Sequence, residues 1–158
     1  ALQKLPQFKD YNFATERSKY LSDLGIPLNT DSTLKGQTIF LAERCAELIQ
    51  TDIITDRTIV DVMAFTMNAK SIHHQDKELF ETYASEFIRE YDYIFYISPY
   101  GLKIEDNGVR ETDEHYRDLI DFTITTLIKR YGHRCNVVEK ISGSTEERIQ
   151  QILNITGL

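Results

Sequence analysis

The chain has 158 residues, of which 41% are hydrophobic and 27% charged, with a formal net charge of −7. These values are ordinary for a globular protein, and the length suits a single domain over residues 1–158. The negative charge argues against a general nucleic-acid-binding surface, although a local basic pocket would be compatible with it. No apolar run approaches the roughly 20 residues that span a bilayer. No signal-peptide pattern opens the chain either, so we expect a cytoplasmic protein without a membrane partner.

Strand and helix patterns alternate along the chain. The opening "ALQKLPQF" is typical of the last turn of a helix, and Cys45 and Cys135 are typical of buried free thiols. Strands are expected in "YNFATER", in 51–55, in "YDYIFYISP" and in "NVVEKIS". Helices are expected over "RSKYLSDLG", from Asp31 or Ser32 to Ile49, from Thr58 to Met67, over "DKELFETYASEFIREY", from Thr112 to Tyr131, and after Ser144. The alternation predicts a three-layer α/β domain with a mainly parallel sheet.

Apolar spacing predicts which side of each element is buried. The strand at 51–55 is apolar enough to be covered on both faces. The helix that follows Ser32 is expected to bury one face carrying Leu34, Leu41, Cys45, Leu48 and Ile49. The helix in "DKELFETYASEFIREY" is expected to bury Leu79, Phe80, Tyr83 and Phe87.

Charged and small polar residues follow the predicted strands. The first strand is followed by Glu16 and Arg17, and the second by Asp56 and Arg57. Because the carboxyl ends of parallel strands meet at one rim, we expect these charges to lie together. A carboxylate there can hold magnesium or accept a proton, and an arginine can bind phosphate through two hydrogen bonds. The alternative is that they are ordinary charges at helix starts.

These motifs and their order resemble the P-loop kinases of small molecules: deoxynucleoside kinases, thymidylate-type kinases and nicotinamide riboside kinase-like domains. "TDRT" at 55–58 resembles the acidic–Arg–hydroxyl motif after the third strand of that group, and Glu16 matches its catalytic glutamate. "DNGVRETDEHYRDLI" resembles the arginine-bearing lid, here about 101–118. "SGSTEER" resembles the loop that contacts the adenine of the bound nucleotide. The resemblance runs over nearly the whole chain.

The resemblance implies a role for each of these positions. Glu16 would act as the general base, Asp56 would hold Mg²⁺, and Arg57 would face the acceptor or its phosphate. Arg17, Arg110 and Arg117 would bind phosphate, with Arg110 acting in catalysis. Ser142, Gly143 and Ser144 would contact the nucleotide. Gln37, early in its helix, could hydrogen-bond a base edge, although an exposed helix-start glutamine is the plainer interpretation.

One part of the family pattern is absent from this sequence. Such kinases bind ATP phosphates with G-x-x-x-x-G-K-[ST] between their first strand and first helix. No Gly-Lys pair occurs in the 158 residues, and the first strand is missing too. In that fold this strand lies between the strands that precede Asp56 and Ser98, so we expect a sheet with a gap. We also expect an additional N-terminal segment of roughly 15–25 residues that carries the strand and the loop.

The expected function is therefore ATP- and Mg²⁺-dependent phosphoryl transfer to a nucleoside or nucleoside monophosphate, provided that the P-loop is present. One alternative is a nicotinamide riboside-type kinase. Another is a nucleotide-binding or assembly protein that has lost catalysis. A homodimer is compatible with each interpretation, and the sequence does not identify the acceptor.

Overall fold

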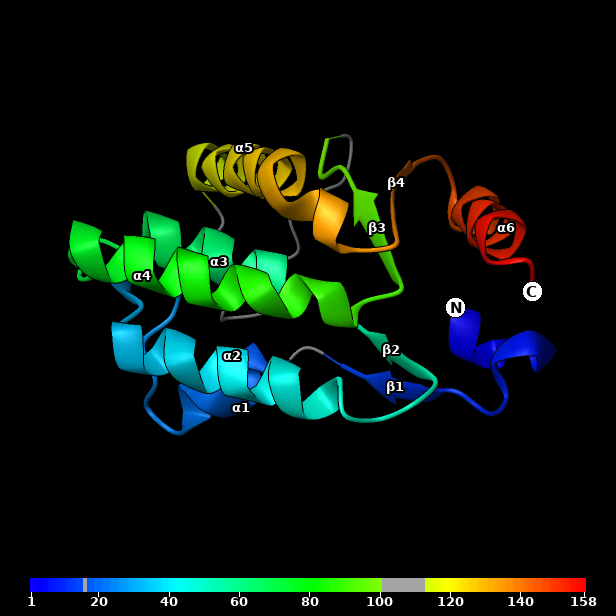
Figure 1. The fold of residues 1–158 in the computed structure, drawn as a ribbon, viewed down its shortest axis with the longest axis horizontal. Helices are drawn as coiled ribbons and strands as arrows, with labels where there is room; N and C mark the ends of the chain where they lie inside the picture. Colours follow the sequence, from blue (N-terminus) through cyan, green and yellow to red (C-terminus); the bar gives the residue numbers. More distant parts are fainter. Residues whose placement is uncertain (16, 101–112) are drawn as a thin grey trace.

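A computed structural model describes residues 1–15, 17–100 and 113–158 (Figure 1). The strands are β1 (Asn12–Ala14), β2 (Ile53–Thr55), β3 (Tyr93–Ile97) and β4 (Val137–Ile141). The helices are α1 (Ser18–Asp23), α2 (Leu34–Glu47), α3 (Ile59–Asn68), α4 (His74–Ser85), α5 (Glu114–Tyr131) and α6 (Thr145–Thr156). Short 3₁₀ turns lie at Leu2–Lys4, Pro6–Phe8, Asn29–Asp31, Glu86–Glu90 and Gly132–Arg134. The described part is thus a mixed α/β structure that is mostly helical.

The strands form two separate parallel pairs. In the first pair, β1 lies beside β2 with Asn12 opposite Ile53 and Ala14 opposite Thr55. In the second, β3 lies beside β4 with Tyr93 opposite Val137 and Ile97 opposite Ile141. The expectation of parallel strands is confirmed. The described strands form two separate sheets, because β2 and β3 do not pair with each other, in keeping with the expected gap in the sheet.

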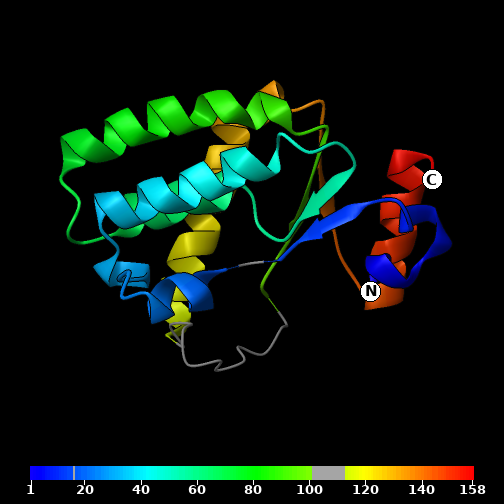
Figure 2. The same ribbon diagram turned by 90° about the horizontal axis from the view of Figure 1, so that it is seen from below.

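The helices lie on both sides of the strands. Figures 1 and 2 show α1 to α5 on one side, whereas α6 and the N-terminal turns lie on the other. Helix α3 is central to the larger group, because it packs against α2, α4 and α5 and none of its residues is exposed. Its buried side chains include Ile59, Val60, Val62, Met63 and Ala64. No described helix has the length and apolar character needed to cross a membrane.

The buried faces differ from the sequence expectation in three places. On α2, Leu34 is 37% exposed, and Ile49 lies beyond the end of the helix at Glu47 and is 84% exposed. On α4, Leu79 and Tyr83 are exposed, and the buried face carries Phe80, Glu81 and Ala84 instead. Strand β2 is only half-buried along its length rather than covered on both faces.

The ends of the helices follow capping chemistry. Thr58 caps α3 and Ser144 caps α6, and each forms a capping box, with Asp61 and Glu147 respectively. Neither Asp31 nor Ser32 caps α2: the Thr33 hydroxyl accepts a hydrogen bond from the Gly36 amide at 3.1 Å. Helix α5 is capped by Asp113; Thr112, where we expected it to begin, lies outside the described residues.

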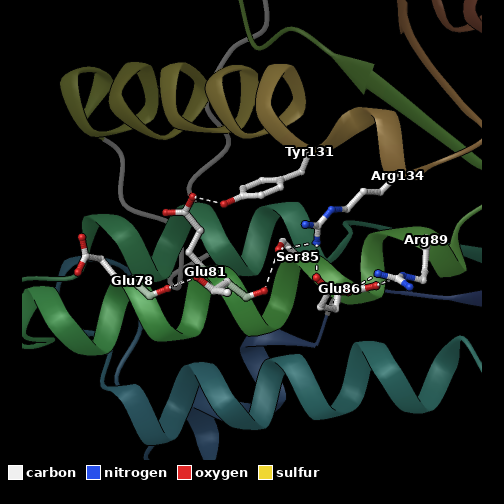
Figure 3. A network of polar contacts seen from close by, with 8 residues as sticks. Glu78, Glu81, Ser85, Glu86, Arg89, Tyr131 and Arg134 are labelled. Atoms are coloured by element: carbon white, nitrogen blue, oxygen red, sulfur yellow. Dashed lines mark hydrogen bonds and ion pairs between the residues drawn. The ribbon is translucent and has the colours of Figure 1, made fainter.

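A polar network joins α4 to the end of α5 (Figure 3). The Tyr131 hydroxyl donates a hydrogen bond to Glu81 at 2.8 Å. Arg130 donates to the same carboxylate oxygen at 2.5 Å. Arg134 donates to both Ser85 and Glu86 at 2.9 Å. Burial and the hydrogen bond to Glu81 raise the pKa of Tyr131. The buried Glu81 is therefore compensated by partners from α5, which fixes these two helices against each other.

One long-range hydrogen bond anchors the start of α3. The hydroxyl of Tyr91, just before β3, accepts a hydrogen bond from the backbone N–H of Ile59 at 3.1 Å. This N–H lies in the first turn of the helix and has no intrahelical partner. Burial raises the pKa of Tyr91 far above its usual range, so its hydroxyl stays neutral.

Substituting Tyr91→Phe should lower the free energy of unfolding by about 1–3 kcal/mol, because it leaves the buried Ile59 N–H without a partner. Urea unfolding followed by circular dichroism measures this change. The matched control is Tyr83→Phe, since Tyr83 is exposed and the change should be close to neutral. Equal losses in the two variants would contradict the assignment.

Candidate functional site

The carboxyl ends of β1 and β2 lie side by side, because Ala14 and Thr55 are partners at the end of the ladder. Arg17 follows β1, and Asp56 and Arg57 follow β2 directly. We call Arg17, Asp56 and Arg57 the β1–β2 rim. The fourth charge expected at this rim, Glu16, which we predicted to be the general base, lies outside the described residues.

Arg57 has an unusual backbone conformation. Its φ of 74° falls in the left-handed region, which a residue other than glycine adopts only at a cost of about 1–3 kcal/mol. Its guanidinium lies 5.2 Å from the centre of the Phe65 ring, a cation–π contact with the next helix. Strained positions of this kind gather at functional sites, and Arg57 forms no ion pair within the described part of the chain.

A second arginine supports the rim from α2. Arg44 is only 4% exposed, and it donates a hydrogen bond to the backbone carbonyl of Asp56 at 3.2 Å. The same guanidinium donates to Glu47 at 2.7 Å. Next to it, Arg17 forms an ion pair with Glu43 at 3.2 Å. The Arg44 guanidinium therefore fixes the position of the backbone that carries Asp56 and Arg57.

Glu47 is under opposing influences. Burial raises the pKa of its carboxyl, Arg44 acts against this rise, and the nearby Glu43 adds to it. The net direction is upward, so the ion pair with Arg44 does not fully offset the cost of burying the charge. Because the folded-state pKa exceeds the unfolded one, this group costs stability as the pH rises through that interval.

Our sequence analysis missed Glu43, Arg44 and Glu47. A signal was present: Arg44 lies three residues after Leu41, within the apolar face of α2, where a charge needs a partner. Gln37, also on α2, is only 3% exposed. The plainer interpretation, an exposed helix-start glutamine, is therefore wrong, and the base-binding role remains a prediction.

The remaining predicted site residues lie elsewhere. Ser144 caps α6 and accepts a hydrogen bond from the Glu147 amide at 3.2 Å. Gly143 has a φ of 95°, a left-handed backbone conformation that favours glycine. Ser142 is hydrogen-bonded to Gln151 through its backbone. All three positions are exposed and their observed contacts are structural.

Arg117 lies in the first turns of α5 and forms an ion pair with its neighbour Asp118 at 3.0 Å. Arg110 and lid residues 101–112 lie outside the described residues. Among those described, no hydrogen bond or ion pair links Arg117 or Ser142–Ser144 to Asp56 or Arg57. The structure thus brings together the charges after β1 and β2, and leaves the other predicted contacts apart.

The predicted metal ligand is an exposed carboxylate. The side chain of Asp56 has no hydrogen bond or ion pair within the described part of the chain, so it is accessible to a cation. No group of three or more His, Cys, Asp and Glu side chains suited to a metal is found in the described ranges. Asp56 could thus contribute one oxygen ligand to a hydrated magnesium ion.

The fold and the rim define an α/β protein with two small parallel sheets and a charged edge on the first. Comparison with known proteins finds no matching family, no matching curated protein and no matching solved structure.

Replacing Arg57 by glycine should relieve the left-handed backbone, whereas replacing it by alanine should not. Both changes remove the contact with Phe65, so we expect Arg57→Gly to be more stable than Arg57→Ala by about 1 kcal/mol in urea unfolding. The control is the reverse change, Gly25→Ala, at a φ of 83° in open space, which should destabilise by a similar amount. Equal stability of the two Arg57 variants would show that the backbone is not strained.

Proposed function

We propose that this chain is a nucleoside or nucleotide kinase-like domain whose β1–β2 rim binds the phosphoryl acceptor. The observation that carries the proposal is the Asp56–Arg57 pair at the end of β2. It combines an accessible carboxylate with an arginine that forms no ion pair in the described part of the chain and sits on a left-handed backbone. The proposed reaction is ATP- and Mg²⁺-dependent transfer to a nucleoside or a nucleoside monophosphate.

The rim has the chemistry that such an acceptor requires. Arg57 offers a planar guanidinium for a phosphate, and Asp56 offers an oxygen for magnesium or for a bound water. Phosphoryl transfer depends chiefly on positioning and charge neutralisation, which both groups can supply. Magnesium would neutralise the transferring phosphates when bound.

The arrangement of the strands also supports the proposal. The strands before Asp56 and Ser98 belong to different pairs and are not joined, as expected of the kinase sheet without its central strand. That central strand leads into the phosphate-binding loop in the kinases that the sequence resembles. The 158 residues contain no Gly-Lys pair of the kind that binds the phosphates of ATP. We therefore assign the rim to the phosphoryl acceptor and not to the triphosphate of ATP.

The same lack of a Gly-Lys pair favours one second candidate, a nucleotide-binding protein without catalysis. A direct measurement distinguishes the two candidate functions. A kinase converts acceptor when ATP and magnesium are added, whereas a binding protein only shows a rise in melting temperature with its ligand. Thymidine, thymidylate, adenosine and nicotinamide riboside form a suitable first panel, the last testing the alternative acceptor class.

Arg57→Ala should weaken binding of a nucleoside monophosphate by about ten- to a hundredfold, because a charge-assisted hydrogen bond to phosphate is lost. Binding of the matching nucleoside should change far less. Calorimetric titration of thymidylate and thymidine measures both. Arg89→Ala is the control, since Arg89 is exposed and its ion pair is with Glu86 and not with a rim residue. Equal losses for the two ligands would contradict a phosphate contact.

Asp56→Asn should raise the magnesium concentration needed for half-maximal nucleotide binding by about tenfold, since an amide is a weaker magnesium ligand than a carboxylate. Nucleotide-induced shifts in melting temperature, recorded over a magnesium series, give this value. Asp52→Asn is the matched control, because Asp52 precedes the same strand at its opposite end. An unchanged magnesium dependence would leave Asp56 as an ordinary charge at a helix start.

A further inference from the structure

Arg57 differs from the other two arginines of the site in having no carboxylate partner. Arg44 forms an ion pair with Glu47 at 2.7 Å, and Arg17 likewise pairs with a carboxylate of α2. The Arg57 side chain forms no ion pair or hydrogen bond within the described residues. Its guanidinium carbon lies over the Phe65 ring instead, 5.2 Å from the ring centre. An aromatic ring thus takes the place that a carboxylate has at the other two arginines.

A carboxylate and an aromatic ring occupy different parts of a guanidinium. A carboxylate accepts hydrogen bonds from the N–H groups, which lie in the guanidinium plane, and so it uses the donors that a phosphate would need. The face of an aromatic ring attracts the positive charge through its quadrupole and leaves those donors free. The contact with Phe65 therefore restrains Arg57 without using its capacity to bind an anion.

The ring that holds Arg57 is itself fixed by the fold. Phe65 lies on α3, is half-buried and packs against the hydrophobic core. Tyr116 of α5, which is buried, packs against it with ring centres 6.4 Å apart and ring planes at 44°. The start of α3 is held by the capping box of Thr58, the residue that follows Arg57. The arginine is thus supported by a side chain on the central helix, and such an element places a group more precisely than a loop does.

We infer that Phe65 is a positioning residue for Arg57: its ring holds the guanidinium at the β1–β2 rim with the N–H donors free for the phosphate of a nucleoside monophosphate. This inference rests on the proposed function and narrows its acceptor class, since a guanidinium without an ion pair fits an anionic acceptor better than an uncharged nucleoside. Ordering the arginine before binding also lowers the conformational entropy that the ligand must otherwise offset.

Replacing Phe65 by ring-fluorinated phenylalanines tests the inference on the full chain. Fluorine withdraws electron density from the ring face, so mono-, di- and trifluorophenylalanine weaken a cation–π contact stepwise while the shape of the side chain changes little. Calorimetric titration with thymidylate, cytidylate, adenylate and guanylate first identifies the monophosphate that binds most tightly. We expect its affinity to fall stepwise, by about three- to tenfold at trifluorophenylalanine, while the affinity for the matching nucleoside changes by less than about twofold.

Phe87 provides the matched control. It is also half-buried against the core and packs against an aromatic ring, that of Tyr83, with ring centres 5.2 Å apart. No arginine of the described residues lies over its ring. The same fluorinated series at Phe87 should therefore leave the affinity for the monophosphate unchanged.

A double-mutant cycle separates positioning from packing. In an Arg57→Ala background, trifluorophenylalanine at position 65 should have no further effect on monophosphate affinity, because the ring acts only through the guanidinium. A ring that merely packs would lower the affinity by the same factor in both backgrounds, and this result would overturn the inference.

The remaining outcomes distinguish the inference from the proposed function. If Arg57→Ala weakens monophosphate binding and fluorination of Phe65 does not, the inference is overturned and the proposed function stands. Equal losses for nucleoside and monophosphate on fluorination would also overturn the inference, because the ring would then act on the nucleoside and not on its phosphate. Binding of none of the four monophosphates, or an unchanged affinity in Arg57→Ala, would overturn both.

Discussion

The burial of helix α3 is the constraint around which the described structure is arranged. None of its residues is exposed, so α2, α4 and α5 must each present an apolar surface to it. Its first turn is held by the Thr58–Asp61 capping box and by the Tyr91 hydroxyl on the Ile59 amide. Because Asp56 and Arg57 come immediately before this turn, the position of the rim depends on how firmly α3 is packed.

Positive and negative side chains pair with one another beside the β1–β2 rim. Arg44 donates a hydrogen bond to the Asp56 carbonyl and forms an ion pair with Glu47. Glu43 forms an ion pair with Arg17. These contacts pair the supporting charges with one another, whereas Asp56 and Arg57 have no ion pair in the described part of the chain. The supporting charges hold the backbone, and the two outer side chains remain accessible to a ligand.

Patterns of short range allowed most elements to be predicted from the sequence. Strands β2 to β4 and helices α3 and α5 follow from β-branched runs, apolar spacing and cap residues. The buried side of α4 could not be predicted, because Leu79 is exposed and Glu81 is buried, the reverse of what their polarity suggests. Glu81 is buried since Tyr131 and Arg130, about 50 residues later, compensate its charge. Long-range pairing of this kind leaves no periodic trace in the sequence.

The candidate site, like the fold, could be predicted only in part. The rim residues Arg17, Asp56 and Arg57 were found because each follows a strand, and the position of a strand end is a local property. The support from Arg44 was missed because its partner is a backbone carbonyl, which any residue could provide. Division of the sheet into two pairs was expected from the resemblance alone, since composition and periodicity do not fix which strands are neighbours.

The placement of α6 has a consequence for how the molecule opens. The helix has no buried residue and packs mainly against β4, so few apolar contacts hold it to the remainder. Local unfolding free energies are lowest where buried contacts are fewest, and α6 can therefore detach while the layer around α3 stays folded. A protease that cleaves within α6 would report this local opening, and its rate would be insensitive to the stability of the helical core.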